Sequence, residues 1–266
     1  MNRFFLIMLL TFIAALVISC EPPEEKPIWE QVKLSDVAST SSDHTTGQLL
    51  KTINLDIHTF EVPAEKIGDL NDLWQALYVK PLRFNDSEAF SANSFLIGFG
   101  QIQMWDKIAF MLRSAGGQKG ETVSLIIPDG QTSDFTVARL GKNQTVFYFS
   151  AVDLMESETI GPGKLVLRIK VGKIPGSRGV CSVNAQPVLT TSIHTSVPQL
   201  ADQAKSAEIS FDSAGFSLKM STGDFVLLGP ERYIDNQITL DSLFFSRPGR
   251  IPTVRILLII CTRIVD

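Results

Sequence analysis

Cysteine and histidine are scarce in this chain, with three of each among 266 residues. No histidine has a cysteine or a second histidine at the short spacing typical of zinc ligands, so we expect no metal site. The sequence also has no Gly-x-Ser-x-Gly nucleophile motif and no phosphate-binding loop ending in Gly-Lys-Ser/Thr. These absences predict a protein that is not an enzyme and that binds no cofactor and no nucleotide.

A surplus of positive charge is also missing. The chain has 24 basic and 28 acidic residues, a formal net charge of −4. A nucleic-acid partner would need basic groups in excess to neutralise phosphates. We therefore expect no nucleic-acid partner.

One long apolar run is present, at the N-terminus. It extends from Phe4 to Ile18 behind Arg3, about the length of a signal sequence and short for a membrane span. The run ends in Val17-Ile18-Ser19-Cys20, which resembles the bacterial lipobox. The resemblance implies that residues 1–19 are a signal peptide and that Cys20 receives a lipid. An ordinary signal peptide with a chance cysteine, or a short membrane anchor, are the alternatives.

The resemblance to a lipobox also implies a cellular location. Cys20 would tether the mature chain to a membrane of the bacterial cell envelope, on its extracytoplasmic side. Glu21 follows it, where aspartate would favour the inner membrane in enterobacteria, so the outer membrane is the favoured location. Residues 20–48 are rich in proline, serine and threonine, a composition that predicts a lipid-anchored tether.

Residues 49–175 predict an α+β domain. Alternation from Ile53 to Val62 indicates a strand, and apolar spacings of three and four predict helices over 64–77 and 104–115, the second closed by Gly116-Gly117. From Glu121 the apolar period becomes two, and Pro128-Asp129-Gly130 predicts a hairpin turn. Gly98-Phe99-Gly100 matches the first two glycines of a dinucleotide-binding motif, but Gln103 stands where the third glycine would be, so we expect no such site.

Residues 176–266 predict a second, β-rich domain. Short strands are separated by turns at Ala214-Gly215 and Thr222-Gly223-Asp224, and Pro187 is typical of an edge strand or a connection. The terminal run Val254–Thr262 is apolar enough to predict a strand buried on both faces at the centre of a sheet. The expected fold class is thus α+β and β-rich, with two helices on a mostly antiparallel sheet followed by an all-β, sandwich-like C-terminal part.

Two further cysteines, Cys181 and Cys261, lie 80 residues apart. In an extracytoplasmic compartment they could form a disulfide, or both could be buried as small apolar side chains. The apolar surroundings of Cys261 favour burial as free thiols, and the sequence leaves the pairing open.

The C-terminal residues 219–266 carry a resemblance of their own. Lys219–Pro230 is similar to a strand-turn-strand of secretin C-terminal domains, and Leu243-Phe244 followed by Arg263-Ile264-Val265 is similar to their closing pattern. Pro230 and Thr262 depart from that pattern. The resemblance implies a part in an outer-membrane secretion assembly, with these residues structural.

Few residues are candidates for chemistry. His194 lies in a stretch rich in serine and threonine and could act as a base, and the carboxylate pairs Glu156/Glu158 and Asp235/Asp241 fall in segments that predict a solvated surface. We expect a lipid-anchored, non-catalytic binding or scaffolding module with a protein partner in the cell envelope. The alternative is an extracytoplasmic hydrolase that acts on glycan or peptide.

Overall fold

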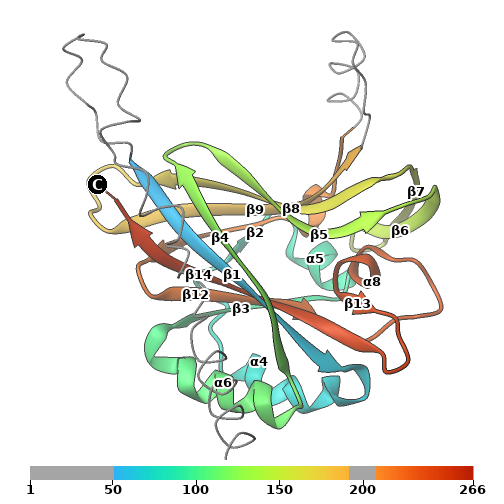
Figure 1. Cartoon of the computed structure of the whole chain (residues 1–266). Coiled ribbons are helices and arrows are strands. Elements are labelled where there is room, and N and C mark those ends of the chain that lie inside the picture. Colours follow the sequence, from blue (N-terminus) through green and yellow to red (C-terminus); the bar gives the residue numbers. More distant parts are fainter. Residues whose placement is uncertain (1–50, 192–207, 266) are drawn as a thin grey trace, which may run out of the picture. The chain divides into compact units, whose positions relative to one another are not determined.

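The computed structural model describes residues 51–191 and 208–265 (Figure 1). The signal peptide, Cys20, His44 and His194 lie outside the described residues, as does the whole predicted tether. In the described part of the chain, no helix is both long and apolar enough to cross a membrane.

Two antiparallel sheets form the body of the protein. Sheet A has the order β3-β12-β14-β1-β4, with β13 beside β14, and sheet B has the order β2-β11-β9-β8-β5, with β10 beside β9. The strands of sheet A are β1 (Thr52–Pro63), β3 (Phe95–Gln101), β4 (Gln118–Pro128), β12 (Asp224–Pro230), β13 (Ser246–Arg247) and β14 (Thr253–Ile264). Those of sheet B are β2 (Arg83–Phe84), β5 (Thr132–Leu140), β8 (Gly163–Lys173), β9 (Val180–Thr191), β10 (Ile209–Ser210) and β11 (Phe216–Ser221).

Short helices and one separate hairpin complete the structure. The hairpin pairs β6 (Gln144–Ala151) with β7 (Leu154–Ile160). The α-helices are α4 (Asn71–Gln75), α5 (Ser87–Ala92), α6 (Trp105–Ser114) and α8 (Leu240–Phe245), and the 3-10 helices are η1 (Ala64–Leu70), η2 (Ile102–Met104) and η3 (Asp212–Ala214). The protein is therefore β-rich with few helices, as predicted.

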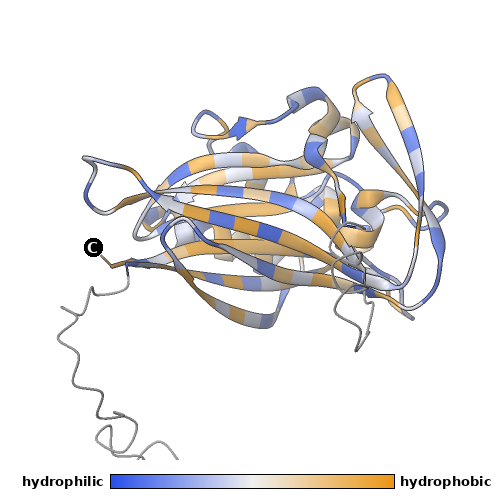
Figure 2. Ribbon diagram, turned by 90° about the horizontal axis from the view of Figure 1, so that it is seen from above, coloured by the Kyte–Doolittle hydropathy of each residue, from blue (hydrophilic) through white to orange (hydrophobic). Residues whose placement is uncertain are grey.

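Sheet A is the middle of three layers (Figure 1). Along β1 the alternation of a strand sends Ile53, Leu55 and Ile57 into the core shared with sheet B. Phe60 and Val62 belong to a second core, which sheet A shares with α4 and α6. Apolar side chains on both faces of one sheet thus create two cores. Figure 2 shows hydrophilic and hydrophobic residues alternating along the strands.

The apolar C-terminal run forms β14, the central strand of sheet A. It pairs with β1 on one side and with β12 on the other. Leu257 is buried against sheet B and Leu258 against the helices. The prediction of a central strand buried on both faces is confirmed.

The predicted division between residues 49–175 and 176–266 is wrong. Residues 49–266 form one compact unit. β8 and β9 lie on either side of position 175 and pair from Gly163 with Thr191 to Lys173 with Cys181. In sheet A, moreover, the last strand of the chain, β14, lies between the first strand, β1, and β12. Because both sheets draw strands from both halves, neither half can close a core alone.

The hairpin predicted at Pro128-Asp129-Gly130 is also wrong, although the turn exists. Its two strands belong to different sheets, since β4 pairs with β1 and β5 pairs with β8. Within the turn, the Asp129 amide donates to the Lys51 carbonyl (2.9 Å) and the Gly130 amide to the Val171 carbonyl (3.0 Å). The turn therefore carries the chain from sheet A to sheet B. The turn at Gly223, where φ is 89°, carries it back from β11 to β12.

The two predicted helices are present in altered form. Residues 64–70 form the 3-10 helix η1, and only Asn71–Gln75 are α-helical, whereas α6 matches the second prediction closely. The glycines of the Gly98/Gly100 pair serve packing on β3. A Cβ atom at Gly98 would lie 2.4 Å from the Cβ of Leu77, and one at Gly100 would lie 2.3 Å from the ring of Phe225.

Pro187 lies in an inner strand instead of at an edge. Residues 180–185 of β9 pair with β11 and residues 188–189 pair with β10, so Pro187 falls where the neighbouring strand changes. Its carbonyl accepts from the Phe211 amide (3.0 Å). No ladder donor is required at that break, which is why proline is tolerated there.

Candidate ligand-binding groove

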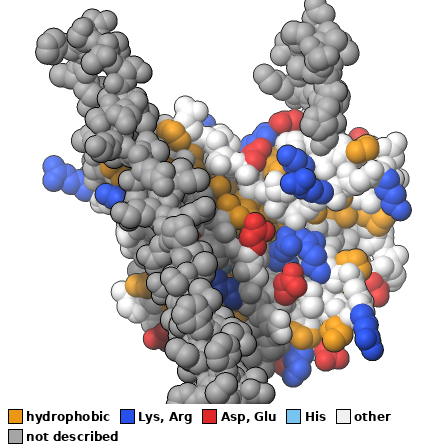
Figure 3. All heavy atoms as spheres, viewed as in Figure 1, with side chains coloured by type: hydrophobic (Ala, Val, Ile, Leu, Met, Phe, Trp, Pro, Cys, Tyr) orange, Lys and Arg blue, Asp and Glu red, His pale blue; other side chains and the backbone are white. Residues whose placement is uncertain are grey.

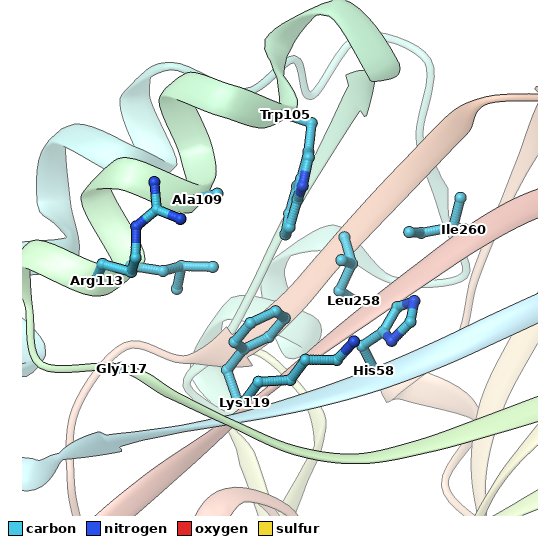
Figure 4. A pocket seen from close by; sticks show the side chains of 10 residues that line it. His58, Trp105, Ala109, Arg113, Gly117, Lys119, Leu258 and Ile260 are labelled. Carbon is cyan, nitrogen blue, oxygen red and sulfur yellow. The ribbon is translucent and has the colours of Figure 1, made fainter.

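A groove of about 450 Å³ lies between α6 and the face of sheet A that is turned away from sheet B. Figure 4 shows its side chains, which come from three segments of the chain: 58–60, 105–119 and 258–260. The lining residues are His58 and Phe60 of β1, Trp105, Ala109, Leu112 and Arg113 of α6, Gly117 and Lys119 at the start of β4, and Leu258 and Ile260 of β14.

The floor of the groove is apolar and well packed. Phe60 and Leu258 are buried, and Trp105 packs against Phe60 with ring centroids 6.1 Å apart. The same indole meets Phe225 edge-on at 5.9 Å. The Trp105 side chain therefore extends from α6 toward sheet A, where its ring borders the groove (Figure 4).

A glycine pair sets the distance between α6 and β4. The Gly116 amide donates to the Arg113 carbonyl (2.9 Å) and the Gly117 amide to the Leu112 carbonyl (2.8 Å), so the predicted helix cap is confirmed. Gly116 has a φ of 75°, which favours glycine. A Cβ atom at Gly117 would lie 2.7 Å from the Leu112 carbonyl oxygen. This tight turn brings Arg113 and Lys119 to the same groove.

A β-bulge places Lys119 on the groove side of the sheet. His58 pairs with Thr122, but Phe60 pairs with Lys119, so β4 has one residue more than β1 in this interval. Strict alternation from Thr122 would send Lys119 to the opposite face. The extra residue returns it to the face of Phe60, and Figure 4 shows its side chain extending toward His58.

The rim carries the positive charge. Lys119 and Arg113 are exposed, and His58 is partly buried, with Nδ1 2.8 Å from the Thr122 hydroxyl. Desolvation by burial lowers the pKa of His58 below 6.5, the nearby Lys119 ammonium lowers it further, and Asp56 opposes both effects. His58 is therefore neutral at pH 7, where Lys119 and Arg113 supply the charge.

Replacing Lys119 by methionine should raise the pKa of His58, because one cause of its depression is removed. An NMR titration of the imidazole measures this, with a His58→Gln variant to assign the signal. Lys107→Met is the matched control, since Lys107 is an exposed residue of α6 that does not line the groove. An unchanged His58 pKa in Lys119→Met would show that the two side chains do not meet in solution.

The structure corrects the prediction for Asp241 and places the other carboxylates. Asp241 is 3% exposed instead of solvated, and it accepts a hydrogen bond from the Thr239 hydroxyl. Burial raises its pKa, while that hydrogen bond acts in the opposite direction. Glu156 accepts from the hydroxyls of Ser150 (2.7 Å) and Tyr148 (2.8 Å), and both bonds lower its pKa. Glu158 and Asp235 are exposed.

A second basic cluster is compensated by nearby carboxylates. Arg247 and Arg255 each donate to the Val137 carbonyl at 2.8 Å. Burial, and then their mutual repulsion, lowers the pKa of Arg247 to about 10. Glu61 and Glu121 act in the opposite direction on Arg255. In the groove, by contrast, the described lining includes no carboxylate.

The polar groups of the groove are few. Its described lining includes His58, Arg113 and Lys119, and no serine, cysteine, aspartate or glutamate. Within residues 51–191 and 208–265, no three His, Cys, Asp or Glu side chains are grouped as a metal would require. Charges of both signs are interspersed on the face seen in Figure 3. Elsewhere in the described residues, Arg168 bridges Asp134 (2.9 Å) and Glu208 (2.7 Å).

Sequence reasoning did not identify the groove. Gly116-Gly117 was predicted as the cap of a helix, but the bulge in β4 that follows it was not predicted. No known protein family, curated protein or solved structure matches the chain. Inferences about the ligand therefore rest on the geometry of the groove, and inferences about the location rest on the N-terminal sequence.

Proposed function

We propose that this protein is a lipid-anchored, non-catalytic binding module of the bacterial cell envelope, held most favourably at the outer membrane through Cys20. Its ligand has an apolar body, which lies in the groove between α6 and sheet A, and an anionic end, which meets Lys119 at the rim. The observation that carries the proposal is the combination of an apolar floor with a rim of cationic groups around a cavity of about 450 Å³.

The size and chemistry of the groove support this ligand class. Small-molecule sites are concave, mostly apolar, and enclose roughly 300–1,000 Å³, with a few polar groups that fix orientation. The apolar body would displace water from Phe60, Trp105 and Leu258. An alkyl or aryl chain ending in a carboxylate, phosphate or sulfonate satisfies both requirements, because ammonium and guanidinium groups form charge-assisted hydrogen bonds with such oxyanions.

The N-terminal sequence supports the location. The apolar run up to Ile18, the small residue Ser19 and then Cys20 are what a lipoprotein signal requires. A lipid anchor would keep the module close to amphipathic molecules of the membrane. The resemblance of residues 219–266 to secretin C-terminal domains extends the proposal to a protein partner in a secretion assembly of the outer membrane. That extension rests on sequence and is not required by the groove.

Decanesulfonate tests the proposal, since it joins an apolar chain to a group that stays ionised over the working pH range. Titration below its micellar concentration should change the fluorescence of Trp105 and saturate. Lys119→Met should weaken binding about tenfold, the equivalent of one lost charge-assisted hydrogen bond of about 1.4 kcal/mol.

Two controls make this result specific. Lys107→Met should bind like the wild type, and decanol, which lacks the charge, should bind all variants equally and more weakly than decanesulfonate binds the wild type. A Trp105→Phe variant confirms the origin of the signal. Equal affinities of the wild type and Lys119→Met for decanesulfonate would contradict the assigned orientation, and the absence of saturable binding would contradict the proposal.

A further inference from the structure

The two described cysteines face each other across the core between the sheets. Cys181 belongs to β9 of sheet B and Cys261 to β14 of sheet A, and both are 0% exposed within the same apolar cluster. They are separated by 80 positions in the sequence. Burial of both was expected from the sequence, but their contact was not.

Hydrogen bonds fix the two residues on either side of the turn at Gly223. The Cys181 thiol donates to the Met220 carbonyl at the end of β11 (3.5 Å), and the Gly223 amide donates to the Cys261 carbonyl (2.8 Å). The crossing from β11 to β12 therefore holds one cysteine to sheet B and the other to sheet A at the same end of the sandwich.

The two thiols interact with each other. Both are free in the structure, and the interaction between them lowers the pKa of Cys181 and, together with burial, raises that of Cys261. A disulfide has an S–S distance of about 2.05 Å, so both side chains must turn toward each other for the bond to form.

We propose that Cys181 and Cys261 form a disulfide that joins sheet A to sheet B in the mature protein. The inference rests on the extracytoplasmic location in the proposed function, because that compartment permits disulfides. It does not depend on the ligand of the groove.

The oxidant is a disulfide-bearing thiol oxidoreductase of the envelope. The thiolate of one cysteine attacks one sulfur of the oxidant's disulfide, which forms a mixed disulfide and releases one oxidant thiolate. The thiolate of the other cysteine then attacks the sulfur of the first and releases the second oxidant thiolate. The two cysteines lose two protons and two electrons, and the oxidant is reduced to a dithiol. Since both sulfurs are fully buried in the folded unit, exchange takes place before the two sheets close.

The disulfide would stabilise the link between the sheets. It closes a loop of about 80 residues and reduces the freedom of the unfolded chain, for which contributions of about 2–4 kcal/mol are typical. In a unit of this size we expect the oxidised wild type to melt roughly 5–15 °C above the same protein after reduction. Comparing two redox states of one sequence avoids the cavity that a substitution would create.

The test uses the full chain purified from its native envelope in detergent. The protein is unfolded in guanidinium with iodoacetamide, with or without prior reduction, and its peptides are analysed by mass spectrometry. Without reductant, the peptides of Cys181 and Cys261 should appear joined and unalkylated. With reductant, both should be alkylated. Alkylation of both cysteines in the unreduced sample would overturn the proposal, as would equal melting temperatures of the two redox states.

A second experiment tests whether the fold alone allows the two cysteines to pair, independently of where the protein is located in the cell. The unfolded chain is refolded in a glutathione redox buffer, where the same disulfide should form, and Cys181→Ser should abolish it. Failure to form it there would overturn the geometric inference. Formation in the buffer but not in the native envelope would contradict the extracytoplasmic location and the proposal for the mature protein. Alkylation of Cys20 in the native sample would contradict the lipid anchor alone and leave the disulfide supported.

Discussion

Replacing Leu257 by aspartate should unfold residues 49–266 as one unit. Leu257 is fully buried in the core between the sheets, and its strand neighbours are Thr59 of β1 and Leu228 of β12. An unpaired carboxylate at this position costs several kcal/mol in desolvation and lost packing, out of a total stability of about 5–15 kcal/mol. Loss of the cooperative melting transition and of the strand signal in circular dichroism is the expected result.

Arg263→Asp is the matched control for this substitution. Arg263 lies on the same strand, but it is exposed, so the same new side chain should leave the fold intact. Hydrogen exchange distinguishes one unit from two domains. In Leu257→Asp, protection should disappear from β8 and β9 as well as from β1. Protection that persists in β8 and β9 alone would contradict the single cooperative unit.

Replacing Cys20 by alanine should abolish lipid attachment completely. The diacylglycerol is attached to the cysteine sulfur through a thioether, and alanine offers no such atom. Incorporation of a labelled fatty acid should fall to background, and the protein should move from the membrane fraction to the soluble fraction. A loss of this size is expected because two acyl chains supply nearly all of the membrane affinity, at about 0.8 kcal/mol for each buried methylene group.

Ser42→Ala, a change in the predicted tether, controls for effects of substitution near the N-terminus and should retain both label and location. Persistence of the Cys20→Ala protein in membranes after a high-salt wash would indicate a membrane-spanning anchor, one of the alternatives for residues 1–19. Retention of the fatty-acid label in Cys20→Ala would exclude Cys20 as the site of lipidation.

The strands could be predicted wherever a local pattern determines burial. In β1, alternating side chains face two different cores, and the period of two is visible in the sequence from Ile53 to Val62. In β14 both faces are buried, so the alternation disappears and a continuous apolar run remains. The C-terminal cap of α6 was predictable for the same reason, since Gly116-Gly117 acts on its own neighbours.

Strand partners could not be predicted in the same way. The turn at Pro128–Gly130 has the residues of a hairpin, but its strands separate because β4 binds β1 and β5 binds β8. The choice depends on β14, more than 100 residues later, which completes sheet A beside β1. The insertion of β14 between β1 and β12 is also what joins the two halves of the chain, and no local pattern near residue 175 indicates it. For this reason the loop there was predicted as a domain boundary. Local turn chemistry determines that the chain reverses, but not which sheet it joins.

The groove was beyond prediction for a related reason. Its lining joins residues from β1, α6, β4 and β14, and no spacing in the sequence connects them. Lys119 depends on a single extra residue in β4 for the face it occupies. Gly116 and Gly117 were the one local signal, because Gly116 has a φ of 75° and a Cβ atom at Gly117 would lie 2.7 Å from the Leu112 carbonyl oxygen.

Mapping the position of a bound ligand tests whether the groove between α6 and sheet A is the binding site. An alkyl sulfonate with a photoreactive diazirine in its chain is bound to the full-length protein, irradiated, and located by peptide mass spectrometry. We expect adducts on the groove segments of β1, α6 and β14, which excess decanesulfonate suppresses and Lys119→Met reduces. Adducts on the outer face of sheet B, or a diffuse pattern that decanesulfonate does not suppress, would contradict the assignment of this groove as the binding site.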